Sequence, residues 1–221
     1  MLGIIILSLG PGLLWLWYFQ RFDPWDREPF ALLVKTFVGG MFMVIPAILW
    51  EGLFRPWLES PPHLLATLLV TFLVVGFAEE GVKLLAVLWG AYFSSHFNEG
   101  LDGIIYAISA GLGFAAVENV FYVLGFGAGV ALPRGVIAFL AHASFAGVMG
   151  YYIGRAKFSS AGGWEMAKGL AWAVFFHGLY DFILIGGILP PWTAIALVAV
   201  VFGWLLILIR RAQQASPFGP N

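Results

Sequence analysis

The sequence predicts an all-α membrane protein, a polytopic bundle of about seven transmembrane helices. Hydrophobic residues fill 61% of the 221 positions and charged residues only 10%, whereas soluble globular domains are about 45–50% apolar and about 25% charged. The apolar residues gather in stretches of about 20, the length of a spanning helix, and the alternation typical of membrane β-strands is absent. The stretches cover roughly residues 2–20, 30–54, 63–91, 101–125, 134–154, 169–189 and 191–209.

The first stretch lacks the basic n-region and the small-residue cleavage site of a signal peptide, so we expect a retained helix. Each stretch ends at a segment rich in proline, glycine or charge, which are residues that end helices. These segments are 21–29, 55–62, 94–99, 125–133, 155–168 and 190–191. We expect one membrane-embedded domain over residues 1–221, with its core at about 63–189.

Basic residues are concentrated in alternate loops, which sets the expected orientation in the membrane. Seven of them would share one side of a seven-span protein, and only Arg55 and Arg134 would lie on the other side. The seven are Arg21, Arg27, Arg155, Lys157, Lys168, Arg210 and Arg211. The distribution predicts a multi-pass protein of the cell membrane with its N-terminus outside and its C-terminus in the cytoplasm.

The composition also excludes several functions. The net charge of −1 gives no basis for binding nucleic acid, which needs concentrated basic charge. The absence of cysteine excludes thiol nucleophiles, disulfides, Cys-ligated zinc and iron–sulfur clusters.

Charged side chains interrupt the third apolar stretch near its middle. Glu79, Glu80 and Lys83 lie there, although a charge at the centre of a bilayer costs about 2.5–3.5 kcal/mol. Glu79 and Lys83 are four residues apart and share a helical face, and Glu80 points about a quarter-turn away. An ion pair that locks helix packing would explain one glutamate and the lysine, and it would leave the second glutamate unexplained.

The fourth stretch carries Glu118 beside Asn119, two polar side chains that cannot face the same direction on a helix. We expect one to enter a site while the other braces a neighbouring helix, and the alternative is a polar clamp between helices. Asp102 opens this stretch, where a helix-start role near the interface is an equally good interpretation.

The fifth and sixth stretches add two histidines. Arg134 opens the fifth, where it could bind a substrate carboxylate or anchor its helix. His142 follows two turns later among small residues, which let helices approach closely, and could be a site residue or a satisfied core residue. In the sixth, His177 and Asp181 are four apart, so the aspartate can orient the imidazole as a base or metal ligand. A pair that only packs helices is the alternative.

Two hydrolytic mechanisms fit these residues. Glu79 or Glu80 could act as a general base and, with His177, activate a water molecule against a carbonyl, while Asn119 or His142 donates to the oxyanion. Alternatively, a zinc ion could activate the water. Its candidate ligands are Glu80, Glu118, His142 and His177. The usual proteolytic motifs, HExxH for zinc and Gly-x-Ser-x-Gly for serine, are absent. The sequence does not choose between the two mechanisms.

Three motifs in this order resemble the PrsW family of intramembrane proteases. They are Glu79-Glu80-x-x-Lys83, Phe114-x-x-x-Glu118-Asn119 and His177-x-x-x-Asp181, and Arg134 and His142 also resemble that family's pattern in the intervening helix. The resemblance implies a helical membrane peptidase that cleaves membrane-anchored protein substrates, such as the extracytoplasmic part of an anti-sigma factor.

The same resemblance suggests roles. Glu79 or Glu80 is the base or metal-linked carboxylate, Glu118 and His177 are its partners, and Asp181 orients His177. The family is similar to a wider group with the CAAX-prenyl endopeptidases and the bacterial Abi proteins, whose suggested mechanism is a glutamate-activated water. That type carries a histidine at the Glu118-Asn119 motif and an asparagine at Asp181.

Two other classes of function remain as alternatives. Ionisable residues within spans also build ion or proton pathways in transporters, although the inverted repeats common in transporters are not recognisable here. A structural or regulatory membrane module could keep the polar cluster for assembly alone.

Overall fold

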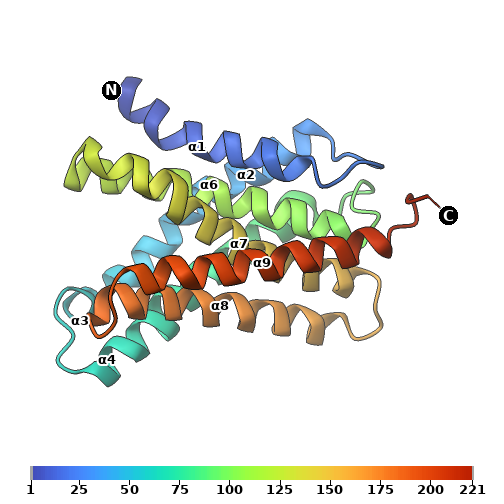
Figure 1. Ribbon diagram of the computed structural model, residues 1–221. Coiled ribbons are helices and arrows are strands. Elements are labelled where there is room, and N and C mark those ends of the chain that lie inside the picture. Colours follow the sequence, from blue (N-terminus) through green and yellow to red (C-terminus); the bar gives the residue numbers. More distant parts are fainter. Residues whose placement is uncertain (1, 221) are drawn as a thin grey trace.

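The computed structural model describes residues 2–220, and these residues form helices joined by short loops without any strand (Figure 1). The predicted all-α class is therefore confirmed. The α-helices are α1 (Leu2–Gln20), α2 (Phe30–Gly52), α3 (Arg55–Glu59), α4 (Leu64–Leu69), α5 (Phe77–Val87), α6 (Gly100–Phe126), α7 (Ala131–Lys157), α8 (Gly162–Gly186) and α9 (Trp192–Gln214). Two π-helical segments, η1 (Val70–Gly76) and η2 (Leu88–Tyr92), flank α5, and a 3₁₀ turn, η3 (Ala128–Val130), precedes α7.

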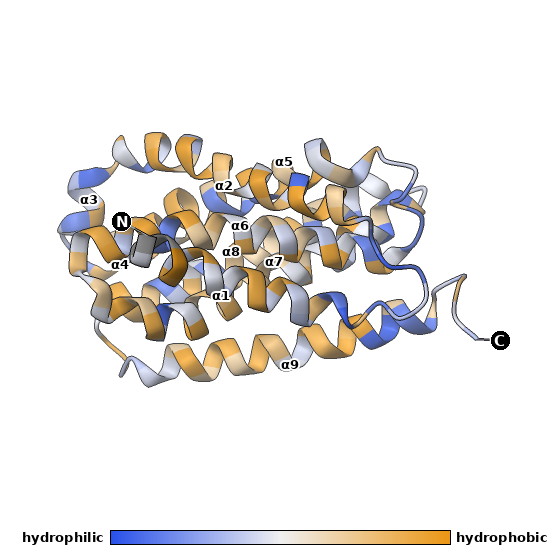
Figure 2. Ribbon diagram, turned by 90° about the horizontal axis from the view of Figure 1, so that it is seen from above, coloured by the Kyte–Doolittle hydropathy of each residue, from blue (hydrophilic) through white to orange (hydrophobic). Residues whose placement is uncertain are grey.

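Within the described residues, six helical stretches are long and apolar enough to cross a membrane. They are Phe30–Gly52, Leu64–Tyr92, Gly100–Phe126, Ala128–Lys157, Gly162–Gly186 and Trp192–Gln214. The 19-residue helix α1 packs beside α6 and α7. Six candidate spans are roughly consistent with the predicted number of about seven. Figure 2 shows apolar residues along the middle of the bundle and hydrophilic residues mainly at its two ends, the pattern of a multi-pass membrane protein.

The segment 155–168, expected as a loop, is mostly helical. Helix α7 continues to Lys157 and α8 begins at Gly162, seven residues before the expected start at 169. The carboxylate of Glu165 explains this extension, since it lies 3.1 Å from Arg155 and 2.9 Å from Lys168. Hydropathy shows where the apolar part of a span ends, whereas a helix can continue beyond that point when its charged side chains form ion pairs.

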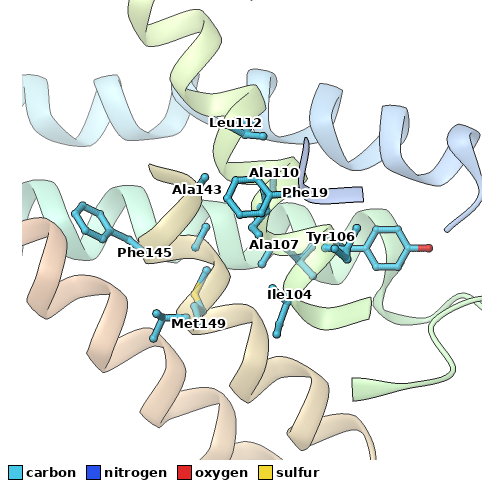
Figure 3. Packing of buried hydrophobic residues seen from close by; sticks show 14 of the residues in the cluster. Phe19, Ile104, Tyr106, Ala107, Ala110, Leu112, Ala143, Phe145 and Met149 are labelled. Carbon is cyan, nitrogen blue, oxygen red and sulfur yellow. The ribbon is translucent and has the colours of Figure 1, made fainter. Parts of the chain in front are cut away.

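Helix α6 forms the centre of the bundle and is buried along most of its length. A methyl group at Gly103 would overlap the backbone of α7, and one at Gly113 would overlap the backbone of α2. These glycines allow the three helices to touch directly, as small residues do in membrane proteins. Figure 3 shows the resulting core, in which Ile104 and Ala107 of α6 face Met149 of α7.

A second close contact sets the position of α8 against the long helix that contains α5. A Cβ at Gly76, the last residue of η1, would lie 3.1 Å from the carbonyl oxygen of Val174. A Cβ at Gly178 would lie 2.7 Å from the Phe72 ring. The two glycines therefore bring α8 within side-chain reach of the acidic residues that follow η1, and π-helical segments often occur at such functional positions.

Candidate active site

A cavity of about 310 Å³ lies between α2, α5, α6, α7 and α8, near the end of the bundle that carries α3. Part of its wall is apolar and comes from residues such as Val44 and Phe114. The ionisable and phenolic side chains of its wall are Glu51, Glu79, Glu118, Tyr122, Arg134, His142, His177, Tyr180 and Asp181. Residues far apart in the sequence thus meet around one polar space within an apolar bundle.

Lys83 lies behind this cavity, fully buried, and its ammonium group uses all three of its protons. The Nζ atom donates to Glu79 Oε2 at 3.2 Å and to Glu80 Oε1 at 2.7 Å, and it lies 2.9 Å from His142 Nδ1. An ammonium group has no acceptor, so Nδ1 of His142 must be the accepting nitrogen. Lys83 therefore fixes both carboxylates of α5 and joins them to α7.

Glu80 faces away from the cavity and holds His177 from behind. Its Oε1 lies 2.7 Å from Nδ1 of His177, and the Glu80 side chain has no exposed surface. A carboxylate oxygen accepts, so Nδ1 of His177 carries a proton and Nε2 has the free lone pair. This carboxylate–imidazole arrangement is the one that fixes the tautomer of catalytic or metal-binding histidines.

Three acceptor atoms converge on the cavity side of His177. Its Nε2 lies 3.4 Å from Asp181 Oδ2 and 3.7 Å from Glu79 Oε2. Acceptors repel one another at such distances unless a proton or a cation lies between them. The site is therefore suited to hold a shared proton or a metal ion at this point.

On the rest of the cavity wall, each side chain contacts the next, from His142 through Glu118 and Arg134 to Tyr122. Because Nδ1 of His142 accepts from Lys83, its Nε2 carries the proton and donates to Glu118 Oε2 at 2.9 Å. The other Glu118 oxygen lies 3.0 Å from Arg134. The Arg134 guanidinium stacks 3.4 Å from the ring centroid of Tyr122. Glu118 is thus held at both oxygens, while Nε of Arg134 is buried and has no partner within the described residues.

The structure brings most of the predicted site residues into one cluster. Asn119 is the exception, because its amide donates to the carbonyl of Leu7 in α1 at 3.4 Å, away from the cavity. The cluster contains Glu79, Glu80, Lys83, Glu118, Arg134, His142, His177 and Asp181. Lys83 contacts both Glu79 and Glu80, so one lysine compensates the charge of two glutamates. The ion pair expected from the sequence had explained only one of them.

Sequence reasoning missed three residues of the cavity wall: Glu51, Tyr122 and Tyr180. Glu51 lies one residue before the end of α2, where a carboxylate is easily interpreted as an interfacial group. Its Oε1 is buried and has no partner among residues 2–220. A lone carboxylate inside the last turn of an otherwise apolar span was the signal available for Glu51. No comparable signal exists for the tyrosines.

Three candidate donors for a metal ion lie close together on the cavity wall. Glu79, His142 and His177 each offer one ligand atom, and these atoms lie within 4.8 Å of one another. The predicted set had Glu80 and Glu118 in place of Glu79. Glu80 is occupied behind His177, and Glu118 is held by Arg134.

Comparisons with known proteins show the family to which this chain belongs. The chain matches the PrsW family of intramembrane metalloproteases over residues 28–209. It is 34% identical to Protease PrsW of Bacillus subtilis (strain 168), over 97% of this chain and 96% of the relative. It is also 34% identical to Protease PrsW of Clostridioides difficile (strain 630), over 97% and 92%. No solved structure matches significantly. The family match and these nearly full-length similarities show that the chain is a peptidase and belongs to the PrsW family of intramembrane metalloproteases.

Proposed function

We propose that this chain hydrolyses peptide bonds of membrane-anchored proteins in the cavity, with Glu79 as the carboxylate that acts on water. The main support is one observation: Glu79 and Nε2 of His177 face the cavity together, while Lys83 and Glu80 hold them from behind. A general base must be oriented but must keep its reactive side free. We also propose that residues 1–221 act as a single protease domain.

The side chains divide the reaction between them. The Glu79 carboxylate takes a proton from a water molecule whose oxygen attacks the carbonyl carbon of the scissile bond, and the same proton passes to the leaving amine. His177, oriented by Glu80, accepts a hydrogen bond from this water through Nε2. Asp181 lies on that same side of His177, at 3.4 Å from Nε2, so we assign the orienting role to Glu80 and place Asp181 in the reactive space.

Stabilisation of the oxyanion needs a donor on the cavity wall. His142 is a poor candidate because its one proton is committed to Glu118, and Asn119 is turned toward α1. The guanidinium of Arg134 lies on the same wall, and the Arg134 side chain is 21% exposed. We therefore assign the oxyanion contact to Arg134, whose position Glu118 and Tyr122 fix.

The residues present fit the metal that the family description implies. Two imidazoles and one carboxylate are a common ligand set of catalytic zinc, and Glu79, His142 and His177 would supply it. Zinc bound there would lower the pKa of its water and polarise the substrate carbonyl. Lys83 contacts Glu79 and His142, so its ammonium group competes with the metal for two of the three ligands.

The position of the cavity supports an extracytoplasmic cut. Helices α2 and α8 both end beside it, at Gly52 and Gly186. Helix α3, which begins at Arg55, and the first turn of α7, which carries Arg134, lie at the same end. The distribution of basic residues assigns this end to the outside. We therefore propose a membrane-anchored substrate that is cut on its extracytoplasmic side, of the kind that the family resemblance suggests for anti-sigma factors.

Purified protein in proteoliposomes, given a single-span test substrate, provides the experiment. Glu79→Gln should lower the cleavage rate by at least about 100-fold, because general bases contribute about 10²–10⁴-fold, while its melting temperature stays close to that of the wild type. Glu59→Gln is the matched control, because Glu59 lies at the same end of the bundle but pairs only with Arg55 on the surface. Cleavage by Glu79→Gln at the wild-type rate would contradict the assignment.

Metal content separates the two mechanisms. If the chain binds zinc, elemental analysis should find about one zinc per chain, and chelation should abolish cleavage until zinc alone is returned. Glu79 would then be a metal ligand and not the base. Full cleavage by a metal-free preparation would leave Glu79 as the base without metal.

A further inference from the structure

A second cluster of carboxylates lies at the opposite end of the bundle from the candidate active site. It joins Asp23 and Glu28 of the α1–α2 loop to Asp102 in the first turn of α6. Asp102 and Glu118 are 16 residues apart in α6, so the two clusters are separated by about 24 Å at 1.5 Å per residue.

The three carboxylates are close together and shielded from water. Each offers one oxygen, and these three atoms lie within 4.8 Å of one another. Asp23 is 1% exposed and Asp102 is fully buried. A small cavity of about 60 Å³ adjoins them, lined by Gln20, Asp23, Arg27, Glu28 and Ile105.

In each of these three carboxylates, one oxygen accepts hydrogen bonds from the protein and the other accepts none within the described residues. Asp23 accepts from the backbone N–H groups of residues 25 and 26, Asp102 accepts from those of residues 98 and 99, and Glu28 accepts from the Tyr106 hydroxyl. The second oxygens, Asp23 Oδ2, Glu28 Oε1 and Asp102 Oδ1, are buried and have no hydrogen-bond partner in the described chain. A buried acceptor without a partner is costly and needs an explanation.

No protein cation supplies that partner. Among residues 2–220, no salt bridge involves Asp23, Glu28 or Asp102. Arg27 is exposed, and the ammonium group of Lys157 donates to the carbonyl of Tyr92.

We propose that Asp23, Glu28 and Asp102 bind a hard divalent cation, Ca²⁺ or Mg²⁺. The ligands are all oxygen atoms, which these ions prefer over nitrogen or sulfur. Two oxygens on opposite sides of a Ca²⁺ ion lie about 4.6–5.2 Å apart, because each Ca–O distance is about 2.3–2.6 Å. Three oxygens within 4.8 Å of one another therefore fit one such coordination sphere with little movement.

The bound cation would tie the α1–α2 loop to the start of α6. That loop also accepts a hydrogen bond from Gln213 of α9 at the Phe22 carbonyl, so one ion would fasten three segments at this end of the bundle. A ligand that binds only the folded state stabilises it by mass action. The cation thus supports the helix that carries Glu118 without entering the peptidase site.

Calorimetric titration of chelator-treated full-length protein in detergent, with CaCl₂ alone and with MgCl₂ alone, tests the proposal. We expect saturable binding to the wild type, weakened at least roughly tenfold in Glu28→Gln because one charged ligand is lost. Glutamine can still accept from the Tyr106 hydroxyl, so the fold should be kept. Asp26→Asn is the matched control, because Asp26 lies in the same loop but contacts Asn98, and it should bind almost as the wild type does.

Thermal unfolding provides the second measurement. The cation should raise the melting temperature of the wild type and of Asp26→Asn, and it should raise that of Glu28→Gln much less. Asp23→Asn serves as a second variant if Glu28→Gln fails to fold. The proposal is overturned if the wild type binds neither cation at millimolar concentration. It is also overturned if Glu28→Gln and Asp23→Asn both bind the cation as tightly as the wild type does.

Discussion

Buried carboxylates lie at both ends of the bundle, but the two ends differ in how the negative charge of these groups is neutralised. At the candidate active site, Lys83 and Arg134 contact the carboxylates, and a cavity of about 310 Å³ opens beside them. At the α1–α2 loop, Asp23, Glu28 and Asp102 form no salt bridge within residues 2–220, and the adjoining cavity is only about 60 Å³. The difference indicates that the first end is built to admit a reacting molecule and the second to hold a small ion.

Removing the lysine should have the largest effect on this contrast. Lys83→Met leaves Glu79 and Glu80 buried side by side without their common cation. Breaking a buried ion pair from one side costs about 3–5 kcal/mol, so we expect a strong fall in melting temperature together with loss of cleavage.

The double variant Lys83→Met/Glu80→Gln tests the cause of that fall. Removing one of the two negative charges should restore part of the melting temperature and none of the cleavage. If Lys83→Met alone unfolds at the wild-type temperature, the lysine does not neutralise the two glutamates.

Glu80→Gln should have the next largest effect. The variant keeps the shape of the side chain but loses the charge that holds Nδ1 of His177. Groups that orient a catalytic or metal-binding histidine typically contribute about 10–100-fold, so we expect a loss of cleavage of that size. The melting temperature should change little, because Lys83 retains Glu79. A variant as active as the wild type would remove Glu80 from the site.

Gly178→Ala should have a smaller effect, acting through the packing of α8. The new methyl group would lie 2.7 Å from the Phe72 ring, and overpacking of this kind costs about 1–3 kcal/mol. We expect a lower melting temperature and slower cleavage, since His177 is the preceding residue. Gly203→Ala in α9 is the matched control, because no atom lies within 4 Å of its added Cβ. Equal melting temperatures for the two variants would contradict the close contact.

Glu51→Gln should have the smallest effect. Glu51 lines the cavity, and its Oε1 has no partner in the described chain, so it can contact substrate without holding another catalytic group. We expect a change of KM by a few-fold with a nearly unchanged kcat, the pattern of lost uniform binding. A loss of kcat comparable to that of Glu79→Gln would instead place Glu51 among the catalytic groups.

The all-α class and roughly the number of spans could be predicted from the sequence because the hydrophobic length of a span is fixed by the membrane. The i, i+4 pairing of Glu79 with Lys83 could be predicted for the same kind of reason, since it follows from helical geometry. The contact between Glu80 and His177 could not, because it depends on how closely Gly76 and Gly178 allow α8 to approach η1. The i, i+4 spacing therefore suggested that Asp181 orients His177. The packing of α8 against η1 instead places Glu80 beside Nδ1 of His177.

The complete set of candidate metal ligands, and the cluster of Asp23, Glu28 and Asp102, could not be predicted from the sequence either. Which carboxylate of Glu79 and Glu80 faces the cavity depends on the rotation of α5 within the bundle, which the pattern of charges left open. Asp102 was equally well explained as a helix-start residue, and it does accept from the N–H groups that precede α6. Only the fold places its other oxygen beside the loop that carries Asp23 and Glu28.

A double-mutant cycle on kcat/KM tests most directly whether groups from separate helices act on one molecule. The cycle compares Glu79→Gln, His177→Gln and the variant with both changes in the same proteoliposome assay. Residues that act as a unit are not additive, so the double variant should cleave within a few-fold of the slower single variant. Two losses that multiply in the double variant would mean that Glu79 and His177 act independently, and would contradict a shared site.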